Sequence, residues 1–397
     1  MQTKAELDLE IIDLPDRSEA ACNRHAWLWH TILQVQRTVN PRSWRLIQTC
    51  FTLLLALIAT LLILSSILHP LESSPIITPD QNELVASSSP IHYDRNPLTV
   101  YSGHRGPVPS VAWSPSGDLL AACGQDATVQ LWERQTGKLL LVYRGHSSTV
   151  TDIAWSPDST RIASVSLDGT AQVWDTHTGK LLFIYHNHNQ VSSIYSVAWS
   201  PDSTRIAIGE GDGVTYVWNV ITGKRLLTYD PTNSNAVLSV AWSPDGTRIA
   251  STSDATMVQV WDATTGQHLI TYQNHNDVVS DVQWSPNNLY IASASYDSTV
   301  QVWNARTGKL LFLDEDHSGF VNSLTWSPNG AIIASGGQDG TIQVWNAFLG
   351  QNIITFLSQA NSVAWSPGGS FIATGGTDGL VKLWPIARPT PGGHSIH

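Results

Sequence analysis

Hydrophobic and polar residues alternate in short stretches through the C-terminal part of the chain. Residues 149–186 contain four such stretches, namely Thr-Val-Thr-Asp-Ile-Ala-Trp, Arg-Ile-Ala-Ser-Val-Ser, Ala-Gln-Val-Trp and Leu-Leu-Phe-Ile-Tyr. Alternation with period two is typical of β-strands, and the Ser, Pro, Asp and Gly residues between the stretches mark turns. No apolar pattern with the helical period extends over ten residues after residue 97. The pattern therefore predicts four short antiparallel strands in this repeat.

The four-strand pattern recurs seven times. The sequence Trp-Ser-Pro begins at Trp113, Trp155, Trp199, Trp242, Trp284, Trp326 and Trp365. A second tryptophan series ends each third strand, and both series have the same spacings of 39 to 44 residues. A single four-stranded sheet cannot bury both faces, so it must stack on neighbours. We therefore predict an all-β fold, a seven-bladed β-propeller of four-stranded antiparallel blades, over residues 97–386.

The two ends of this region are complementary. The seventh repeat lacks a fourth strand, because only a short stretch rich in Pro and Gly follows Trp384. Residues 98–104 align with residues 140–146, yet no repeat precedes them. We expect Leu98–Tyr101 to supply the missing strand and to close the ring, which removes an exposed sheet edge.

One uninterrupted apolar run lies before the repeats. Residues 46–68 (LIQTCFTLLLALIATLLILSSIL) carry no charge. As a helix the run would be about 34 Å long, enough to cross the ~30 Å core of a bilayer. A cleaved signal peptide has a shorter apolar region close to the N-terminus, whereas 45 residues precede this run. We predict that a single transmembrane α-helix at 46–68 precedes the propeller.

The charges beside this run predict its orientation. Arg37, Arg42 and Arg45 precede it, and four acidic residues follow before the next basic residue, Arg95. Positively charged flanks stay in the cytoplasm. We therefore expect a single-pass membrane protein with a cytoplasmic N-terminus and an extracytoplasmic propeller.

Three further segments complete the predicted organisation. Residues 1–45 form the cytoplasmic segment, in which 17–39 have a helical pattern that fits either a helix on the membrane surface or a juxtamembrane helix without a separate role. Residues 69–96 are rich in Pro and Ser and predict an extended linker. Residues 387–397 are expected to form a flexible tail.

Charge and candidate ligands argue against several functions. The net charge of -11 is spread along the chain without a basic stripe, so no nucleic-acid partner is expected. His186 and His188 precede Glu210 and Asp212, but without the spacing of a structural zinc site. We therefore predict no metal, no cofactor and no disulfide framework, since the three cysteines lie in separate regions.

The repeats resemble the WD-repeat family. Gly103-His104 and Gly145-His146 match its Gly-His element, and Trp174-Asp175 matches its Trp-Asp dipeptide. Six repeats also place an Asp six residues before the second Trp. The resemblance covers residues 97 to about 386 and is to WD-repeat proteins of the membrane-anchored, bacterial type.

The resemblance implies a hydrogen-bonded network in each blade. It joins the His of the loop that leads into the blade, a Ser or Thr of the second strand, the Asp and the Trp. In the second blade the Ser is Ser164 or Ser166. The other residues assigned to such networks are His104, Asp126, Trp132, His146, Asp168, Trp174, Asp212, Trp218, Trp261, His275, Asp297, Trp303, His317, Asp339, Trp345, Asp378 and Trp384. Because the set recurs from blade to blade, it is typical of a scaffold, and no catalytic residue is expected.

The resemblance also implies which face binds a partner. It places the loops between blades and the loops that carry the Asp on one recognition face, and the third, fourth and seventh connecting loops depart from the repeat. The candidate partner-binding residues are Gln125, Leu167, Tyr296, Phe320 and Gln338. The acidic run 314–316 favours a basic partner or is a solvated turn. We expect a membrane-tethered, non-catalytic scaffold for a protein or peptide; the alternatives are an extracytoplasmic ligand sensor and a propeller enzyme.

Overall fold

The computed structural model describes residues 96–187, 193–231, 236–252 and 256–386, all within the compact unit Ser87–His397. The predicted membrane helix at 46–68, the segment 1–45, the linker to residue 95 and the tail 387–397 lie outside the described residues. Within the described ranges, no helix is long and apolar enough to cross a membrane.

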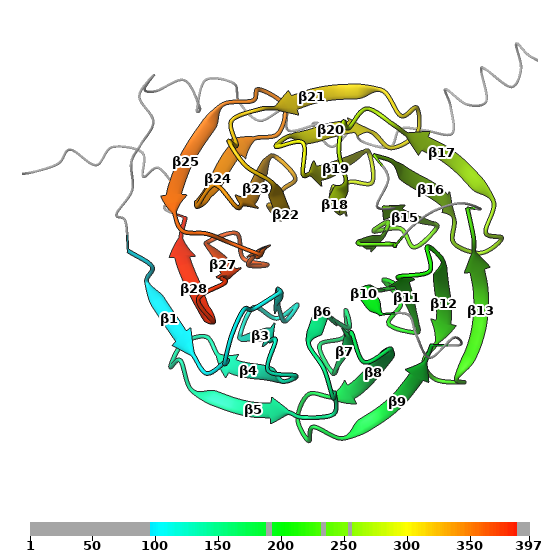
Figure 1. Ribbon diagram of the computed structural model, residues 1–397, viewed down its shortest axis with the longest axis vertical. Helices are drawn as coiled ribbons and strands as arrows, with labels where there is room; N and C mark the ends of the chain where they lie inside the picture. Colours follow the sequence, from blue (N-terminus) through cyan, green and yellow to red (C-terminus); the bar gives the residue numbers. More distant parts are fainter. Residues whose placement is uncertain (1–95, 188–192, 232–235, 253–255, 387–397) are drawn as a thin grey trace, which may run out of the picture. The chain divides into compact units, whose positions relative to one another are not determined.

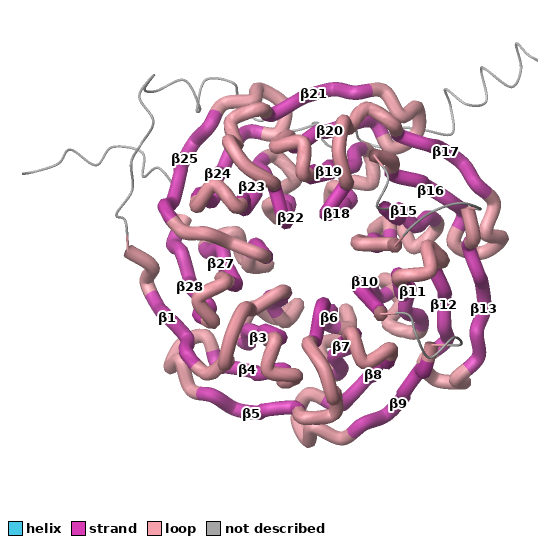
Figure 2. Tube along the Cα trace, viewed as in Figure 1, coloured by secondary structure: helices cyan, strands magenta, loops and turns pink. Residues whose placement is uncertain are grey.

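The described residues form seven four-stranded antiparallel sheets arranged as blades around a central channel (Figure 1). The prediction of an all-β, seven-bladed propeller is therefore confirmed. Figure 2 shows that only strands and loops are present in this part of the chain.

Each blade contains four strands, which are ordered from the channel to the rim. The strands of blades 1 to 3 are β2 (Ser110–Trp113), β3 (Leu119–Cys123), β4 (Val129–Glu133) and β5 (Leu139–Tyr143); β6 (Val150–Trp155), β7 (Arg161–Ser166), β8 (Thr170–Asp175) and β9 (Leu181–His186); and β10 (Ile194–Trp199), β11 (Arg205–Glu210), β12 (Thr215–Asn219) and β13 (Lys224–Tyr229). Those of blades 4 and 5 are β14 (Val240–Trp242), β15 (Arg248–Thr252), β16 (Val258–Asp262) and β17 (His268–Tyr272); and β18 (Val279–Trp284), β19 (Tyr290–Ser295), β20 (Val300–Asn304) and β21 (Leu310–Asp314). Those of blades 6 and 7 are β22 (Val321–Trp326), β23 (Ile332–Gly337), β24 (Thr341–Asn346) and β25 (Asn352–Leu357); and β26 (Ser362–Trp365), β27 (Phe371–Gly375), β28 (Leu380–Pro385) and β1 (Thr99–Ser102).

The two middle strands of a blade are buried on both faces. In β7 all residues after Arg161 are buried, whereas β9 has a single buried residue, Tyr185. The apolar side chains form seven clusters, one at each boundary between adjacent blades. Neighbouring blades thus bury the faces that one sheet cannot bury alone, at roughly 25 cal/mol for each Å² of apolar surface.

The ring is closed by the strand expected from the sequence. β1 pairs antiparallel with β28, with Thr99 opposite Leu383 and Tyr101 opposite Val381. The Leu98 amide adds a bond to the Leu383 carbonyl at 2.7 Å. Tyr101 is buried against Trp132 of blade 1, with the two ring centres 5.6 Å apart. The prediction that Leu98–Tyr101 completes blade 7 is confirmed.

Tryptophans of the first series connect inner strands of neighbouring blades, except Trp242 and Trp365, whose buried Nε1 atoms have no hydrogen-bond partner among the described residues. Trp155 Nε1 of blade 2 donates to the Ala112 carbonyl of blade 1 at 3.1 Å. Trp113 makes the same bond to Ala364 across the closure of the ring. Trp199, Trp284 and Trp326 repeat the contact with their preceding blades. These indoles therefore hold the blades in place around the channel, a role that the Trp-Ser-Pro motif alone did not reveal.

Candidate functional site

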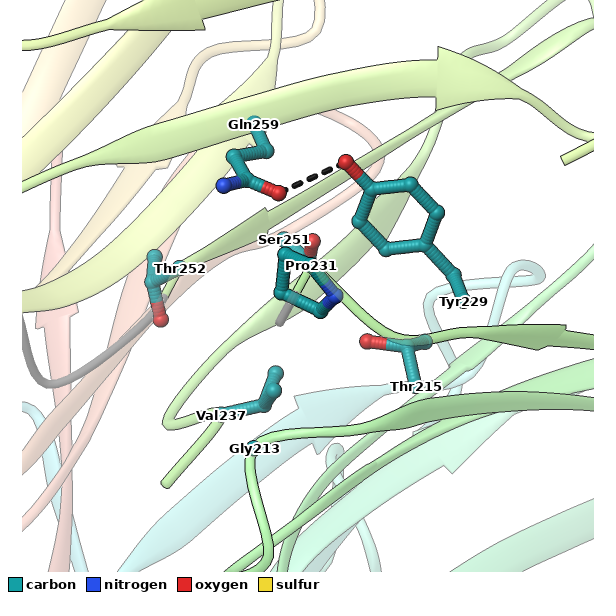
Figure 3. Close-up of a pocket in the computed structure, with 8 residues that line it drawn as sticks. All are labelled: Gly213, Thr215, Tyr229, Pro231, Val237, Ser251, Thr252 and Gln259. Carbon is teal, nitrogen blue, oxygen red and sulfur yellow. Dashed lines mark hydrogen bonds between the residues drawn. The ribbon is translucent and has the colours of Figure 1, made fainter. Parts of the chain in front are cut away.

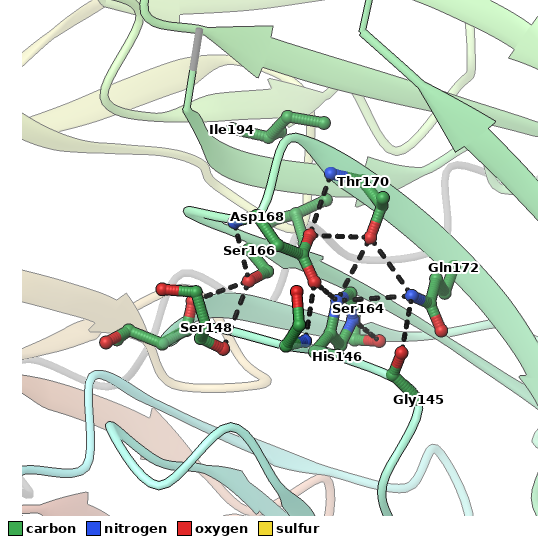
Figure 4. A network of polar contacts seen from close by, with 12 residues as sticks. Gly145, His146, Ser148, Ser164, Ser166, Asp168, Thr170, Gln172 and Ile194 are labelled. Atoms are coloured by element: carbon green, nitrogen blue, oxygen red, sulfur yellow. Dashed lines mark hydrogen bonds and ion pairs between the residues drawn. The ribbon is translucent and has the colours of Figure 1, made fainter. Parts of the chain in front are cut away.

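The expected polar network is complete in blade 2, and Figure 4 shows its His146, Ser164 and Asp168. The Trp174 indole donates to Ser164 Oγ at 3.2 Å, and Ser164 Oγ lies 2.8 Å from His146 Nε2. Because Ser164 accepts from the indole, its own hydrogen is available to His146 Nε2, which leaves Nδ1 to donate to Asp168 at 3.1 Å. Ser166, the other serine considered, instead donates to the Thr149 carbonyl.

The same geometry occurs in blades 5 and 6. His275 and His317 contact Asp297 and Asp339 at 2.9 Å, and serines bond their Nε2 atoms. Burial opposes ionisation of Asp168, but hydrogen bonds from His146, Thr170 and the Ser147 amide hold its pKa well below the ordinary value. The groups are mutually satisfied and recur, as is typical of a scaffold rather than of a catalytic triad.

Blade 1 has only part of the network. His104 Nδ1 contacts Asp126 at 3.1 Å, but Ala122 takes the place of the serine. The Nε2 atom of His104 is buried without a hydrogen-bond partner in the described part of the chain.

Blade 7 lacks the histidine and uses other partners. Asp378 accepts from Lys382 Nζ at 2.7 Å, and Trp384 Nε1 donates to Thr374 at 3.0 Å. Asp378 therefore does not take part in a His–Asp network, because the shortened connecting loop brings no imidazole to it.

Blade 3 departs furthest from the expectation. Asp212 is exposed and accepts the Val214 amide of its own turn at 3.0 Å. Ile208 takes the place of the serine, and the buried Trp218 Nε1 has no hydrogen-bond partner among the described residues. The structure thus places neither Asp212 nor Trp218 in the expected network, since the second strand offers no hydroxyl.

Blade 3 instead contains a buried carboxyl, that of Glu210. Glu210 is 1% exposed, and its Oε1 accepts from the Tyr185 hydroxyl at 2.7 Å. Burial raises the pKa of Glu210 to about 7, although the bond from Tyr185 opposes that shift. From the sequence, Glu210 was a candidate only for metal binding, because its contact with Tyr185 forms between two blades.

A small cavity lies at the boundary of blades 3 and 4 (Figure 3). Trp261 Nε1 donates to Ser251 at 3.2 Å as in the complete networks. Tyr229, Ser251, Gln259 and Thr215 line a cavity of about 10 Å³, close to the smallest volume that holds one water molecule. The buried Thr215 hydroxyl, which lines it, has no partner among the described atoms.

Tyrosines of the outer strands form a second set of ties that the sequence analysis missed. The hydroxyls of Tyr143, Tyr229 and Tyr272 each donate at 2.6 Å to a glutamine of the next blade. Their rings stack on that blade's second tryptophan, with centres 4.4 to 4.7 Å apart. Asp314 occupies the equivalent position in blade 5. It is 3% exposed, and its Oδ2 has no partner within the described ranges.

The candidate partner-binding residues all follow the second strand of a blade or lie in a connecting loop. The amides of Gln125, Leu167, Tyr296 and Gln338 donate to the connecting-loop carbonyls of Pro107, Thr149, Val278 and Phe320. These bonds place the candidates on the same face, at different blades. Leu167 and Phe320 are 41% and 43% exposed.

The structure brings together only part of this set. Tyr296 of blade 5 stacks on Phe320 of blade 6, with the ring centres 4.8 Å apart and the planes 23° from parallel. Gln338 adjoins the pair through its bond to Phe320 at 2.8 Å. Gln125 and Leu167 belong to blades 1 and 2 and do not join it. The irregular parts of the third and fourth connecting loops, 188–192 and 232–235, lie outside the described residues.

Acidic residues occur in the loops beside the aromatic pair. Burial raises the pKa of Tyr296, and the nearby Asp277 carboxylate raises it further. Glu315 and Asp316 are exposed in the connecting loop that carries Phe320. No Lys or Arg occurs in 272–279, 296–299, 314–321 or 338–341. This part of the face therefore combines an aromatic surface with negative charge.

The channel is lined by a belt of hydroxyls and two carboxyls. It has a volume of about 450 Å³, and each blade contributes one residue to the belt, from its inner strand or directly before it: Ser110, Asp152, Ser196, Ser239, Asp281, Ser323 and Ser362. Asp152 accepts from Ser196 and the Val197 amide at 3.0 Å, and Asp281 accepts the Leu324 amide at 2.9 Å.

These carboxyls are used to join blades. Burial raises the pKa of Asp152 to about 6 in spite of its hydrogen bonds. Its oxygens are occupied by donors from its own blade and the next, so the belt resembles a structural ring rather than a reactive centre. Throughout the described ranges, no three His, Cys, Asp or Glu residues are grouped so that they could hold a metal ion.

Two protein families match the chain. The family described as "IFT122 first beta-propeller" matches residues 193–390, and the family described as "WD domain, G-beta repeat" matches residues 95–133 and 137–175. Together the matches cover most of the region in which the structure shows blades.

Similarity to individual curated proteins is confined to short segments. The chain is 51% identical over 39 residues to the probable cytosolic iron-sulfur protein assembly protein CIAO1 homolog of Chlamydomonas reinhardtii, which is 10% of this chain and 11% of that protein. It is 52% identical over 42 residues to the ribosome biogenesis protein erb1 of Aspergillus clavatus, 11% of this chain and 5% of the relative. It is 36% identical over 72 residues to the serine-threonine kinase receptor-associated protein of Rattus norvegicus, 17% and 21% of the two chains. The matches thus span only a minor part of each relative's length.

Proposed function

The chain is a WD40-repeat seven-bladed β-propeller, and from this fold and its acidic, aromatic face we propose that it is a membrane-tethered scaffold that binds a protein or peptide partner. WD40 propellers bind protein partners and are generally non-catalytic. The observation that carries the proposal is the stacked pair Tyr296 and Phe320, which spans the boundary of blades 5 and 6.

The pair has the properties of an interface anchor. Aromatic side chains contribute a large share of binding energy in protein interfaces, since they bury a large area with few rotatable bonds. Phe320 keeps 43% of its surface exposed although its ring is already stacked on Tyr296. The partner would place an apolar side chain against these rings and basic side chains toward Asp277, Glu315 and Asp316.

A non-catalytic role is supported by the state of the polar groups. The His, Ser and Asp side chains of blades 2, 5 and 6 are mutually hydrogen-bonded and buried. The channel carboxyls are likewise occupied by donors from neighbouring blades. A reactive site would need a group that is free to meet substrate.

The membrane tether is part of the proposal and rests on the sequence. The uncharged run 46–68 is long enough to span a bilayer, and the arginines before it favour a cytoplasmic N-terminus. The propeller would then lie outside the cytoplasm, joined by the linker 69–96. Protease treatment of intact cells tests this arrangement: we expect cleavage of the propeller, and protection would contradict the orientation.

Affinity capture with the full chain tests the binding face. Proteins retained by the wild-type chain should be lost at least about tenfold with Tyr296→Ala/Phe320→Ala. The matched control is Phe348→Ala, since Phe348 is 47% exposed in the turn between β24 and β25 on the opposite face. Both variants should melt as the wild type does. Equal retention of the same proteins by the double variant would show that the wrong face was chosen.

A further inference from the structure

The outer strands of blades 7, 1 and 2 expose more aliphatic surface than those across the ring. β1, β5 and β9 follow one another along the rim (Figure 1). With the residue before β1 they carry seven aliphatic side chains that are 38% to 60% exposed: Leu98, Val100, Leu139, Leu140, Leu181, Leu182 and Ile184. We call this surface the leucine arc. By contrast, β13 and β17 each expose one, Leu226 and Leu269.

The leucine arc contains a groove as well as a surface. An open groove of about 440 Å³ lies between β5 and β9, lined on its apolar side by Val142, Leu181 and Ile184. Arg144 also lines it. Exposed apolar side chains that gather around a groove often mark a surface that a partner or a membrane covers.

Basic side chains flank the leucine arc. Lys138 and Arg144 stand at the two ends of β5, and Lys180 precedes β9; all three are exposed. The acidic residues nearest in sequence are Glu133 and Asp175, and Asp175 is bound by its own turn through Thr178 Oγ1 at 2.7 Å. The net charge of the whole chain is -11, so this combination of aliphatic and basic groups is local.

In blade 5, exposed leucines lie beside acidic residues. β21 also exposes two leucines, Leu311 and Leu313. That strand continues into Glu315 and Asp316, which repel an anionic surface. Lys309 precedes β21 as Lys138 precedes β5, but β5 is followed by Arg144 and not by acidic residues.

The chain enters the propeller at the leucine arc. β1 begins at Thr99, and the uncharged run that we propose as the membrane helix ends at residue 68. The sequence predicts an extended linker at 69–96, and a flexible chain of about 28 residues has a root-mean-square span of roughly 30 Å, so such a linker would keep the start of β1 within reach of the bilayer. Tethering raises the effective concentration of lipid at the surface beside the linker.

We propose that the leucine arc docks on the surface of an anionic lipid bilayer. The leucines would enter the boundary between headgroups and acyl chains, and Lys138, Arg144 and Lys180 would meet lipid phosphates. This inference rests on the membrane tethering proposed above. It sets the propeller with its rim on the membrane, which leaves the face with Tyr296 and Phe320 open to a partner.

Site-directed spin labelling of the full chain tests the docking. In a Cys22→Ser/Cys50→Ser background, with the buried Cys123 retained, a nitroxide is placed through Leu140→Cys, Leu182→Cys or the control Leu269→Cys. Leu269 is 42% exposed, close to the 48% of Leu140 and 51% of Leu182. The chain is reconstituted into vesicles of phosphatidylcholine with phosphatidylglycerol. Collision rates with oxygen, which enters bilayers, and with a water-soluble nickel chelate are then compared.

The labels at 140 and 182 should show a several-fold higher ratio of oxygen to nickel collisions than the label at 269. The difference should shrink in phosphatidylcholine alone, and with Lys138→Gln/Arg144→Gln/Lys180→Gln. Equal ratios at the three positions would overturn the proposal. Dipolar coupling between the 140 labels of two chains, without the change in collision ratio, would identify a second copy as the occupant and would also overturn it.

Carbonate extraction of the same vesicles separates this proposal from the tether. A chain that resists extraction but keeps residue 140 in water overturns the docking alone. A chain that is extracted although residue 140 was protected beforehand overturns the tether and supports the docking. Extraction of a chain whose label was never protected overturns both.

Discussion

The Tyr185 hydroxyl of blade 2 donates to Glu210 Oε1 of blade 3 at 2.7 Å. In three other blades the equivalent tyrosine donates to a neutral glutamine, as Tyr143 does to Gln172 at 2.6 Å. Tyr216 stands where that glutamine would be in blade 3, and the acceptor comes from the adjacent strand instead. The hydrogen bond between blades 2 and 3 therefore has an ionisable acceptor, the Glu210 carboxyl.

We predict that this contact makes stability depend on pH. Burial raises the pKa of Glu210 to about 7 from an ordinary value of 4.5. Between these values the folded state binds more protons than the unfolded one, so the free energy of unfolding falls as pH rises. Glu210→Gln, which keeps the acceptor, should stabilise the protein by on the order of 1–3 kcal/mol at pH 8 and hardly at pH 4. Urea unfolding at both pH values measures this; equal effects at the two would contradict it.

The histidine networks of blades 1 and 2 allow a reciprocal test. Ser164→Ala removes the partner of His146 Nε2 and of Trp174, and should cost about 1–3 kcal/mol. Ala122→Ser supplies the missing hydroxyl to His104 Nε2, which is buried without a partner among the described residues. It should stabilise the protein by about 1 kcal/mol. Both effects are read from urea unfolding, and destabilisation by both variants would refute the equivalence of the two sites.

Replacement of Asp314 by tyrosine, the residue at the equivalent position of other blades, should stabilise the protein. Burial, reinforced by Asp316 and then Glu315, raises the pKa of Asp314 to about 7. Asp314→Tyr should stack on Trp345 and remove the buried carboxyl, with a gain of about 1–3 kcal/mol at pH 8. Asp314→Asn is the control, because it removes the charge without adding a ring. Thermal unfolding should rank Tyr above Asn above wild type at pH 8, with a smaller spread at pH 5.

Removal of the closing strand should destabilise the whole ring. Deletion of Leu98–Tyr101 unpairs β28 and removes Tyr101, which is 3% exposed, from the boundary of blades 7 and 1. The loss of such a side chain alone costs at least about 3 kcal/mol. Calorimetry should show a lower melting temperature with a single cooperative transition. An unchanged melting temperature would mean that closure by β1 is dispensable.

Much of the fold was predictable because a propeller repeats its local chemistry. Two tryptophan series, the turn residues between the strands and the unmatched stretch Leu98–Tyr101 were enough to predict the number of blades and the closing strand. Part of the candidate site followed as well, since Tyr296 and Phe320 stood out as apolar residues at loop positions. Their stacking across a blade boundary was not visible, because it depends on two loops that are far apart in sequence.

The sequence by itself determined that seven four-stranded blades form and where the ring closes, since period and turn residues act within one repeat. The tertiary structure decided which groups meet across blade boundaries. The Tyr185 hydroxyl of blade 2 donates to Glu210 of blade 3, whereas Asp314 of blade 5 keeps a buried Oδ2 atom without a hydrogen-bond partner among the described residues. Each of these outcomes depends on substitutions in two neighbouring repeats. Only packing shows whether one repeat compensates for the other.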